Sequence, residues 1–391
     1  MRQSVIVSGA RTPFGKFGGA LKDIEAVALG ATAMKAAIER STLDPAEIDE
    51  VMMGMVLQGG AGQIPSRQAA RLAGLNWHVT TETINKVCAS GMRSVTLADQ
   101  IIRSGDADTI LAGGMESMSN APYLDPGARW GARMGNRELI DLMIHDGLEC
   151  AFDKVHMIVH GSYVAEEFGI TRDEQDEWAL RSHQRAIYAR NKGYWAEEIV
   201  PMPIVSKNGT TYMEQDEAPR ADTRLDKLSA LPSLFVKEGT ITAGNAPGVN
   251  DGAAAVVVMS KEKAVSKGLM PLATIIGHTT IGQKARYIAT TPALAIQKLL
   301  QQTSMSLEQI DRFEVNEAFA AVVLTCGKLT GWDLDKVNVN GGAIALGHPI
   351  AASGTRIILT LIHELRRIGG GYGIAAICSG GAQGDAILLR V

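Results

Sequence analysis

A cysteine in the stretch NKVCASGM is the first residue of this chain whose setting could support chemistry. Cys88 lies between an apolar run and a small-residue turn that opens a long apolar helix. At a helix start, orphan backbone N–H groups and the positive end of the helix dipole stabilise a thiolate, the nucleophilic form of cysteine. Core packing is the competing interpretation, because free cysteine is among the most buried residue types.

Three other stretches supply chemical partners for a thiol. Asn316 opens NEAFA, His348 follows the run NGGAIALG, and Cys378 begins CSGGAQG. Each also has a structural interpretation, as a helix cap, a turn residue and a core thiol, respectively. The combination favours function, because a thiol nucleophile needs a neighbouring base and its acyl intermediate needs oxyanion donors. A further glycine-rich stretch, residues 242–252, lets backbone and substrate approach closely.

The composition is that of a large globular protein without a nucleic-acid or membrane signature. The 391 residues are 46% apolar and 20% charged, which suggests two or three structural units. A net charge of −4 gives no basic field for nucleic acid, and no apolar run reaches the roughly 18 residues of a membrane span. The four cysteines lack metal-ligand spacing, so a reducing compartment is expected. With no signal or transit peptide in view, we expect a cytoplasmic protein.

Strand and helix patterns alternate at short spacing through much of the chain. We expect strands at 5–7, 51–56, 109–112 and 251–259, and helices at 23–40 and 89–104. This alternation predicts an α/β protein with a parallel-type sheet covered by helices. The segment 119–249 differs, because it carries most of the aromatic residues, charged helical stretches and polar loops. We interpret it as an inserted, loop-rich domain.

The C-terminal part of the chain repeats the pattern of the N-terminal part. Helices are expected there at 292–302 and 354–367, and strands at 313–315 and 373–378. The order Ser-Gly-Met-Arg, helix, Gly, strand, Gly-Gly near the N-terminus matches the order Ser-Gly-Thr-Arg, helix, Gly, strand, Gly-Gly near the C-terminus. This duplication predicts two βα units related by pseudo-symmetry, with the site where their helix ends meet.

The chain resembles the thiolase family, acetyl-CoA acetyltransferase type, over essentially its whole length. VCASGM, NEAFA, GGAIALGHP and a terminal Cys-x-Gly-Gly segment occur in that family's order, and together they are highly specific. The resemblance implies a thiolase fold in which duplicated βα halves form a five-layer α/β/α/β/α core with an inserted loop domain. The implied domains are an N-terminal half at 1–118 plus 250–270, a loop domain at 119–249 and a C-terminal half at 271–391.

The resemblance also implies an activity and a role for each reacting residue. The activity is the reversible Claisen condensation of two acetyl-CoA to acetoacetyl-CoA plus CoA, a ping-pong reaction through an acylated Cys88. His348 resembles the base that draws the proton from Cys88, and Cys378 resembles the acid/base that acts on the acyl α-carbon. Asn316, through a water, and His348 would form one oxyanion site. The backbone N–H groups of Cys88 and Gly380 would form the other.

The family likeness extends to coenzyme A binding and assembly. The positions that match coenzyme A contacts are Leu148, His156, Met157, Arg220, Phe235, Ala243, Gly244, Pro247, Ala318 and Phe319. Residues 123–141 resemble the loop through which thiolase dimers pair, which implies a homotetramer. Coenzyme A thioesters are substrates, and this chemistry implies no cofactor and calls for no divalent metal.

Several positions depart from the family pattern without touching the four reacting side chains. Pro247 replaces a common Ser, and Ile158 and His160 replace the common Gly and Thr. Ala351 and Ala382 replace glycines, and IATTP at 288–292 replaces Met-Gly-x-Gly-Pro beside the acyl pocket. These departures bear on coenzyme A contacts and acyl-chain preference. The extra methyl of Ala382, near an oxyanion turn, could lower the rate.

Other functions remain open at this stage. A 3-ketoacyl-CoA thiolase of fatty-acid β-oxidation would use the same chemistry on longer chains, and only the acyl pocket separates the two. A condensing enzyme of the ketoacyl synthase type resembles this fold but lacks a cysteine at the position of Cys378. A catalytically silent acyl-CoA-binding protein is disfavoured by the intact set of Cys88, His348, Cys378 and Asn316. The sequence leaves the physiological direction open.

Overall fold

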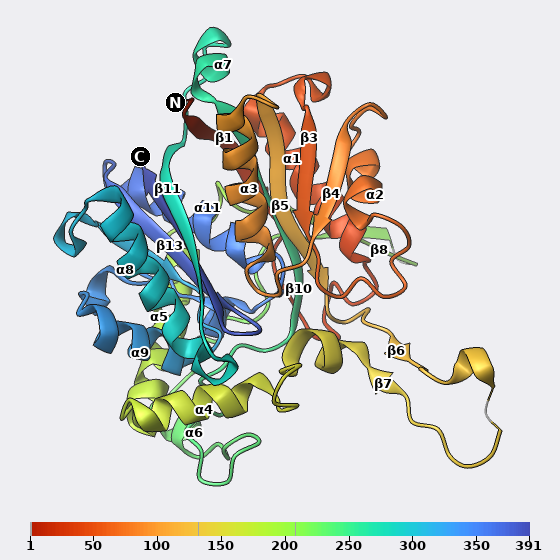
Figure 1. Ribbon diagram of the computed structural model, residues 1–391, viewed down its shortest axis with the longest axis vertical. Helices are drawn as coiled ribbons and strands as arrows, with labels where there is room; N and C mark the ends of the chain where they lie inside the picture. The colour runs from red at the N-terminus through yellow and green to blue at the C-terminus, as the bar shows by residue number, and fades with distance from the viewer. Residues whose placement is uncertain (1, 132, 208) are drawn as a thin grey trace.

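A single ten-stranded mixed sheet organises the protein in the computed structural model, which describes residues 2–131, 133–207 and 209–391 (Figure 1). Its N-terminal half follows the order β1 (Ser4–Arg11), β10 (Asn250–Ser260), β5 (Thr109–Ser117), β3 (Glu50–Gly54), β4 (Thr80–Ile84). Its C-terminal half follows the order β11 (Ala273–Gly282), β14 (Gln383–Arg390), β13 (Tyr372–Ser379), β12 (Arg312–Val315). Two residue pairs between β1 and β11 join the halves, and the short β2 (Gly15–Lys16) pairs with β10.

Helices cover both outer faces of the sheet halves and fill the space between them. The outer layers contain α1 (Ala26–Ser41) and α2 (Pro65–Leu72) on the N-terminal half, and α8 (Thr291–Thr303) and α9 (Ala320–Thr330) on the C-terminal half. The inner layer contains α3 (Ser90–Ser104) and α11 (Ser353–Arg367). Twelve of the fifteen residues of α11 are buried, because sheet and helix surround it. These layers form the predicted α/β/α/β/α core.

The predicted duplication is visible in the strand order. Reading outward from the junction, β1, β10, β5, β3 and β4 correspond to β11, β14, β13, β12 and a single parallel bridge at Val337. The first turns of α3 and α11 touch at matching glycines, since a Cβ on Gly91 would lie 2.6 Å from the Thr355 hydroxyl and one on Gly354 would lie 2.4 Å from the Met92 nitrogen. The two helix starts therefore meet, as the sequence predicted.

The expectation of a parallel-type sheet was wrong in part. Only the pairs β3–β4, β3–β5 and β12–β13 are parallel, whereas β10 and β14 run antiparallel to both of their main neighbours. A parallel neighbour needs a long crossover, but β13 and β14 are joined by residues 380–382 alone, which suffices only for a hairpin. The expected strand at 109–112 also continues through its two glycines to Ser117.

The predicted inner and outer helices are all present, with ends that differ by up to three residues. The helix expected at 23–40 is α1, which begins at Ala26. Those expected at 89–104, 292–302 and 354–367 are α3, α8 and α11, each starting one residue away from its predicted start. Periodic apolar spacing locates these helices well because one face of each packs on a sheet.

The segment 119–249 replaces the hairpin between β5 and β10 with short elements. Its strands are β6 (Tyr123–Leu124), β7 (Ile140–Asp141), β8 (Met202–Ser206) and β9 (Gly209–Met213), and its helices are α4 (Met157–Glu167), α5 (Arg172–Asn191) and α6 (Leu225–Ser229). The β6–β7 hairpin extends away from the body (Figure 1). Helices α4 and α5 instead share a hydrophobic core with α8 and α9. The rest of the fold comprises α7 (Lys261–Ser266) and α10 (Ala343–Leu346).

Across the described ranges, none of the helices is both long and apolar enough to cross a bilayer.

Candidate active site

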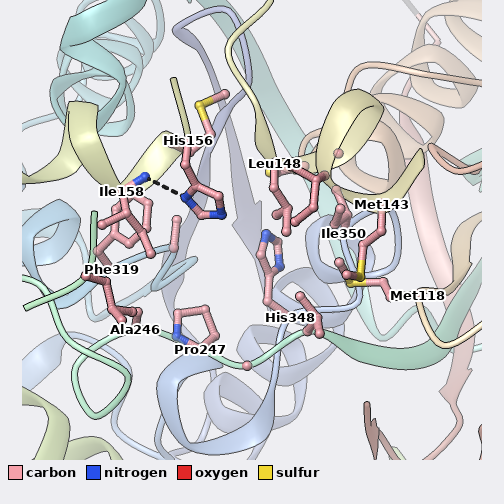
Figure 2. A pocket seen from close by; sticks show the side chains of 18 of the residues that line it. Met118, Met143, Leu148, His156, Ile158, Ala246, Pro247, Phe319, His348 and Ile350 are labelled. Atoms are coloured by element: carbon pink, nitrogen blue, oxygen red, sulfur yellow. Dashed lines mark hydrogen bonds between the residues drawn. The ribbon is translucent and has the colours of Figure 1, made fainter. Parts of the chain in front are cut away.

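An apolar cavity of about 300 Å³ lies where the two halves meet the inserted segment. Figure 2 shows its wall, with the His348 ring pointing into the space across from His156. Ten of the residues proposed from sequence line this one cavity: Cys88, Leu148, His156, Met157, Phe235, Pro247, Ala318, Phe319, His348 and Cys378. The fold thus brings together Cys88, His348 and Cys378 from far-apart positions and surrounds them with apolar residues.

Cys88 lies in a tight turn just before α3. The hydroxyl of Ser90 accepts a hydrogen bond from the Lys86 backbone N–H at 2.8 Å and donates one to the Val87 carbonyl at 2.6 Å. Val87 has a φ of 46°, a left-handed conformation that is costly for a β-branched residue. The backbone N–H groups of Cys88 and Gly380 both hydrogen bond toward the Cys88 thiol. The turn therefore presents the sulfur to the cavity with two backbone donors beside it.

The resting state of Cys88 differs from the thiolate that its helix-start position suggested. Although the residue keeps some exposure to the cavity, burial raises the pKa of the thiol to about 12. The two backbone N–H donors lower the pKa but do not outweigh desolvation. Cys88 is therefore a neutral thiol at physiological pH, and a nearby base must take its proton before it can attack.

His348 has the protonation state that such a base needs. Its Nδ1 lies 2.6 Å from the Ser353 hydroxyl oxygen, and that hydroxyl donates its single proton to the Pro349 carbonyl at 2.9 Å. The hydroxyl can therefore only accept from His348, which places the ring proton on Nδ1. The other nitrogen, Nε2, is buried and finds no partner among the residues that the structure describes. The Nε2 lone pair is thus free to accept a proton.

Burial also keeps the imidazole neutral. Desolvation, aided by the positive charge of Arg356, lowers the pKa of His348 to about 3. A neutral imidazole and a neutral thiol exchange a proton without creating an isolated buried charge, because the resulting ions form a pair.

Glycine and asparagine fix the loop that carries His348. Gly347 has a φ of 103°, and a Cβ there would lie 2.4 Å from the Asn250 carboxamide carbon. That carboxamide accepts the His348 backbone N–H at 2.9 Å. The close approach requires glycine at residue 347, so the position of the imidazole depends on it.

Cys378 is the penultimate residue of strand β13 and lines the same cavity. Burial, with a further contribution from the nearby Cys88, raises the pKa of its thiol well above the usual value. Gly380 follows it in the turn, where a Cβ would lie 3.1 Å from the Met157 side chain and 3.2 Å from Val87. Glycine keeps the backbone N–H of this turn accessible to the Cys88 sulfur.

Asn316 lies behind the cavity wall rather than on it. The residue is fully buried at the end of β12, and its backbone N–H donates to the Ala376 carbonyl at 3.0 Å. Neither polar atom of its side-chain amide has a protein partner within the described ranges. Buried amides are normally hydrogen-bonded, so a bound water is the expected partner of this side chain. That arrangement suits the indirect role implied for Asn316.

The residues proposed for coenzyme A divide into a cavity group and an outer group. In the cavity, the His156 ring stacks on Phe235 with centroids 4.2 Å apart, and its Nδ1 accepts the Ile158 N–H at the start of α4. Arg220, Ala243 and Gly244 do not line the cavity. Arg220 is exposed, and its guanidinium lies 3.2 Å from Nε2 of His183. Their contacts with coenzyme A stay predictions.

Sequence reasoning missed residues that shape or support the site. Met118, Met143 and Ile350 line the cavity, and no sequence pattern distinguishes them from core residues. Ser353, which fixes the His348 tautomer, stands at the start of the duplicated Ser-Gly motif and could have been found by comparison with Ser90. Glu116 is buried beside the loop that carries His348, and no local sequence pattern marks it as part of the site.

Comparisons with known proteins agree with this geometry. Residues 4–262 match the family description "Thiolase, N-terminal domain" and residues 269–391 match "Thiolase, C-terminal domain". The acetyl-CoA acetyltransferase of Escherichia coli K12 is 49% identical over 391 residues, covering 100% of this chain and 99% of its own. The acetyl-CoA acetyltransferase of Cupriavidus necator is 48% identical, with 100% of both chains covered.

A solved structure confirms the thiolase fold. The crystal structure of the Bacillus anthracis acetyl-CoA acetyltransferase superposes with a TM-score of 0.98 at 42% sequence identity, covering 100% of this chain and 99% of that one. The family profiles span nearly the whole sequence, and the relatives are similar from end to end. This chain belongs to the thiolase family.

Proposed function

We propose that this protein is an acetyl-CoA acetyltransferase, an acyltransferase that interconverts two acetyl-CoA with acetoacetyl-CoA and CoA. The observation that carries the proposal is the convergence of Cys88, Cys378 and the unpartnered Nε2 of His348 on one apolar cavity. The shared name of full-length relatives at 47–49% identity supports the acetyl specificity. The reacting groups also match the demands of Claisen chemistry, which must stabilise negative charge on two oxygens.

In the thiolysis direction, His348 Nε2 takes the Cys88 proton and the thiolate attacks the 3-keto carbon of acetoacetyl-CoA. The backbone N–H groups of Cys88 and Gly380 hold the tetrahedral oxyanion. Cleavage of the carbon–carbon bond leaves an acetyl group on Cys88 and releases the enolate of acetyl-CoA. The protonated His348, with a water on Asn316, stabilises the enolate oxygen while the Cys378 thiol protonates its carbon.

The second half of the reaction restores the enzyme. An incoming CoA thiol gives its proton to the Cys378 thiolate, and the CoA sulfur attacks the acetyl-Cys88 carbonyl. The tetrahedral intermediate collapses to acetyl-CoA and the Cys88 thiolate, which takes back the proton from His348. Condensation follows the same steps in reverse order, so a single set of groups serves both directions.

Assembly, location and domain limits belong to this proposal as well. We propose a homotetramer, supported by the protruding β6–β7 hairpin, where Trp130 is 84% and Met134 is 98% exposed. A cytoplasmic location rests on the widely spaced free cysteines, and a role in fatty-acid metabolism rests on the acyl-CoA substrates. The division into residues 1–118 plus 250–270, 119–249 and 271–391 remains a proposal.

A substrate series tests the function and its main alternative. Purified protein is given CoA with acetoacetyl-CoA or with 3-ketoacyl-CoA thioesters of increasing chain length, and loss of the 3-ketoacyl thioester is followed. We expect the highest kcat/KM for acetoacetyl-CoA, because the cavity has a volume of only about 300 Å³ and the full-length relatives are acetyl-CoA acetyltransferases. A maximum at longer chains would favour the β-oxidation thiolase. CoA binding without turnover of any substrate would favour a silent acyl-CoA-binding protein.

A further inference from the structure

Three side chains beside the acyl-CoA cavity form a cluster that the reaction does not use. Cys150 Sγ, a carboxylate oxygen of Asp153 and a ring nitrogen of His160 all lie within 4.8 Å of one another. Thiolate, carboxylate and imidazole are the three ligand types that zinc takes in proteins. No zinc site is predicted from the sequence, because the spacing Cys-x2-Asp-x6-His lacks the paired cysteines or histidines of common zinc motifs.

A tight turn fixes two of these ligands. The Cys150 N–H donates to the Val155 carbonyl at 2.8 Å, and the Lys154 N–H donates to the Cys150 carbonyl at 2.9 Å. Lys154 adopts a left-handed φ of 54°, which reverses the chain. Inside this turn the Asp153 N–H points at the Cys150 sulfur, 3.5 Å away. A backbone N–H aimed at the sulfur helps to orient it as a ligand.

The third ligand comes from the first turn of α4. His160 Nε2 lies 3.0 Å from Asp153 Oδ2, while its Nδ1 is buried without a partner in the part of the chain that the structure describes. Nε2 is the ring nitrogen beside Asp153 and is therefore the ligand atom that His160 offers, while Nδ1 would carry the ring proton. Cys150 and His160 are 1% and 4% exposed, whereas the Asp153 side chain is half exposed and leaves an entry path from solvent.

We propose that Cys150, Asp153 and His160 bind one zinc ion, which braces the wall of the acyl-CoA cavity. Three protein ligands leave a fourth tetrahedral position for water. Binding releases the Cys150 thiol proton and ties the turn to α4. Between the ligands lie His156, Met157 and Ile158, which line the cavity. The ion takes no part in the thiolase reaction, and the proposal stands whether or not the proposed function holds.

Cobalt binding tests the site directly, because a thiolate–Co²⁺ bond absorbs in the near ultraviolet. The titration uses the full chain with Cys88→Ala and Cys378→Ala, in a non-thiol reductant, so that only Cys150 and Cys326 remain as thiols. We expect one Co²⁺ per chain, a charge-transfer band and displacement by Zn²⁺. Adding Cys150→Ala abolishes the band, whereas adding Cys326→Ala, a matched loss of a buried thiol, leaves it unchanged.

Two further variants separate ligand loss from misfolding. Asp153→Asn changes a half-exposed side chain and preserves the fold, yet weakens Co²⁺ binding by more than about tenfold, as does His160→Thr. Circular dichroism confirms that each variant is folded. The proposal is overturned if the folded background protein shows no charge-transfer band, if the band survives Cys150→Ala, or if Asp153→Asn and His160→Thr bind Co²⁺ as tightly as the background.

Discussion

The two halves of the sheet share one framework but join their equivalent strands differently. In the C-terminal half, residues 380–382 connect β13 to β14, whereas in the N-terminal half residues 118–249 connect β5 to β10. The short turn carries Gly380 beside the reacting sulfur, and the long segment contributes cavity-wall residues such as Leu148 and His156. One copy of the hairpin thus places a backbone N–H beside the Cys88 sulfur, where we propose an oxyanion donor, and its expanded counterpart contributes to the wall of the cavity.

Equivalent positions also carry different side chains. Cys88 precedes its Ser-Gly helix start by two residues, and the matching residue before α11 is Ala351. Cys378 pairs with Gly384 on the adjacent strand, and near the corresponding end of β5 the residue paired with Gly252 is Glu116. The cysteines of the two halves therefore lie in one site and have no second pair in the equivalent place. Glu116 instead contacts the loops beside that site.

Glu116 shows how that support works. Its carboxylate accepts the backbone N–H groups of Val56 and Leu57, at distances from 3.0 to 3.3 Å, and of Ala351 at 3.0 Å. It thereby links the loop after β3 to the loop that carries His348. Burial raises the pKa of this carboxyl group to about 7 despite those donors. Glu116 thus acts as a structural anchor between two loops.

The largest expected effect comes from removing the nucleophile. Cys88→Ala should lower kcat for thiolysis by on the order of 10⁴-fold or more, because no other group can form the acyl intermediate. Cys326→Ala, which removes a thiol from the buried face of α9, should leave kcat within a few-fold. Steady-state assays of both variants check this, and near-normal turnover by Cys88→Ala would refute the nucleophile assignment.

A smaller loss, in the reactivity of Cys88, is expected when the tautomer of His348 is no longer fixed by a hydrogen bond. Ser353→Ala removes the acceptor of the Nδ1 proton, so the ring can turn its lone pair away from Cys88. We expect iodoacetamide alkylation of Cys88 at neutral pH to slow by about 10- to 100-fold. Ser94→Ala is the matched control, because this buried helical hydroxyl bonds only a backbone carbonyl, that of Ser90. Equal alkylation rates in the two variants would remove Ser353 from the mechanism.

Replacing Glu116 should change how the unfolding free energy depends on pH. Native Glu116 holds its proton up to about pH 7, whereas the unfolded chain releases it near the ordinary value of 4.5. The native state therefore binds more protons between these values, so this group makes the unfolding free energy fall as pH rises through that window. Glu116→Gln should make the unfolding free energy decrease less steeply with pH in this window. Urea unfolding between about pH 5 and pH 7 measures it, and identical slopes would show that Glu116 does not titrate as described.

The smallest effect is expected on stability, from a substitution in the turn between β13 and β14. Ala382 has a φ of 51°, where glycine avoids a steric cost that alanine bears. Ala382→Gly should change the unfolding free energy by no more than about 1 kcal/mol in the stabilising direction, because the more flexible unfolded chain offsets part of the gain. Thermal unfolding would detect this, and a clear loss of stability would show that the methyl contributes packing instead.

The sequence predicted the convergence of three side chains better than it predicted the sheet. The glycine-flanked Cys88, His348 and Cys378 line one cavity, and their catalytic roles stay predictions. The antiparallel course of β10 and β14 was missed, since a fully buried strand reads the same in either direction. The position of Cys88 at a helix start also led to the wrong expectation of a lowered pKa, because desolvation by burial outweighs the local backbone donors. Glu116 acts through contacts with residues 56, 57 and 351, which no local pattern reveals.

The most direct test of this account is to locate the acyl group after brief exposure to acetyl-CoA. The reaction is quenched in acid, digested and mapped by mass spectrometry over the four cysteine peptides. The account predicts one acetyl group on Cys88 and none on Cys150, Cys326 or Cys378. An acetyl group on Cys378, or no adduct while CoA still binds, would contradict the assignment of Cys88 as the residue that carries the acyl group.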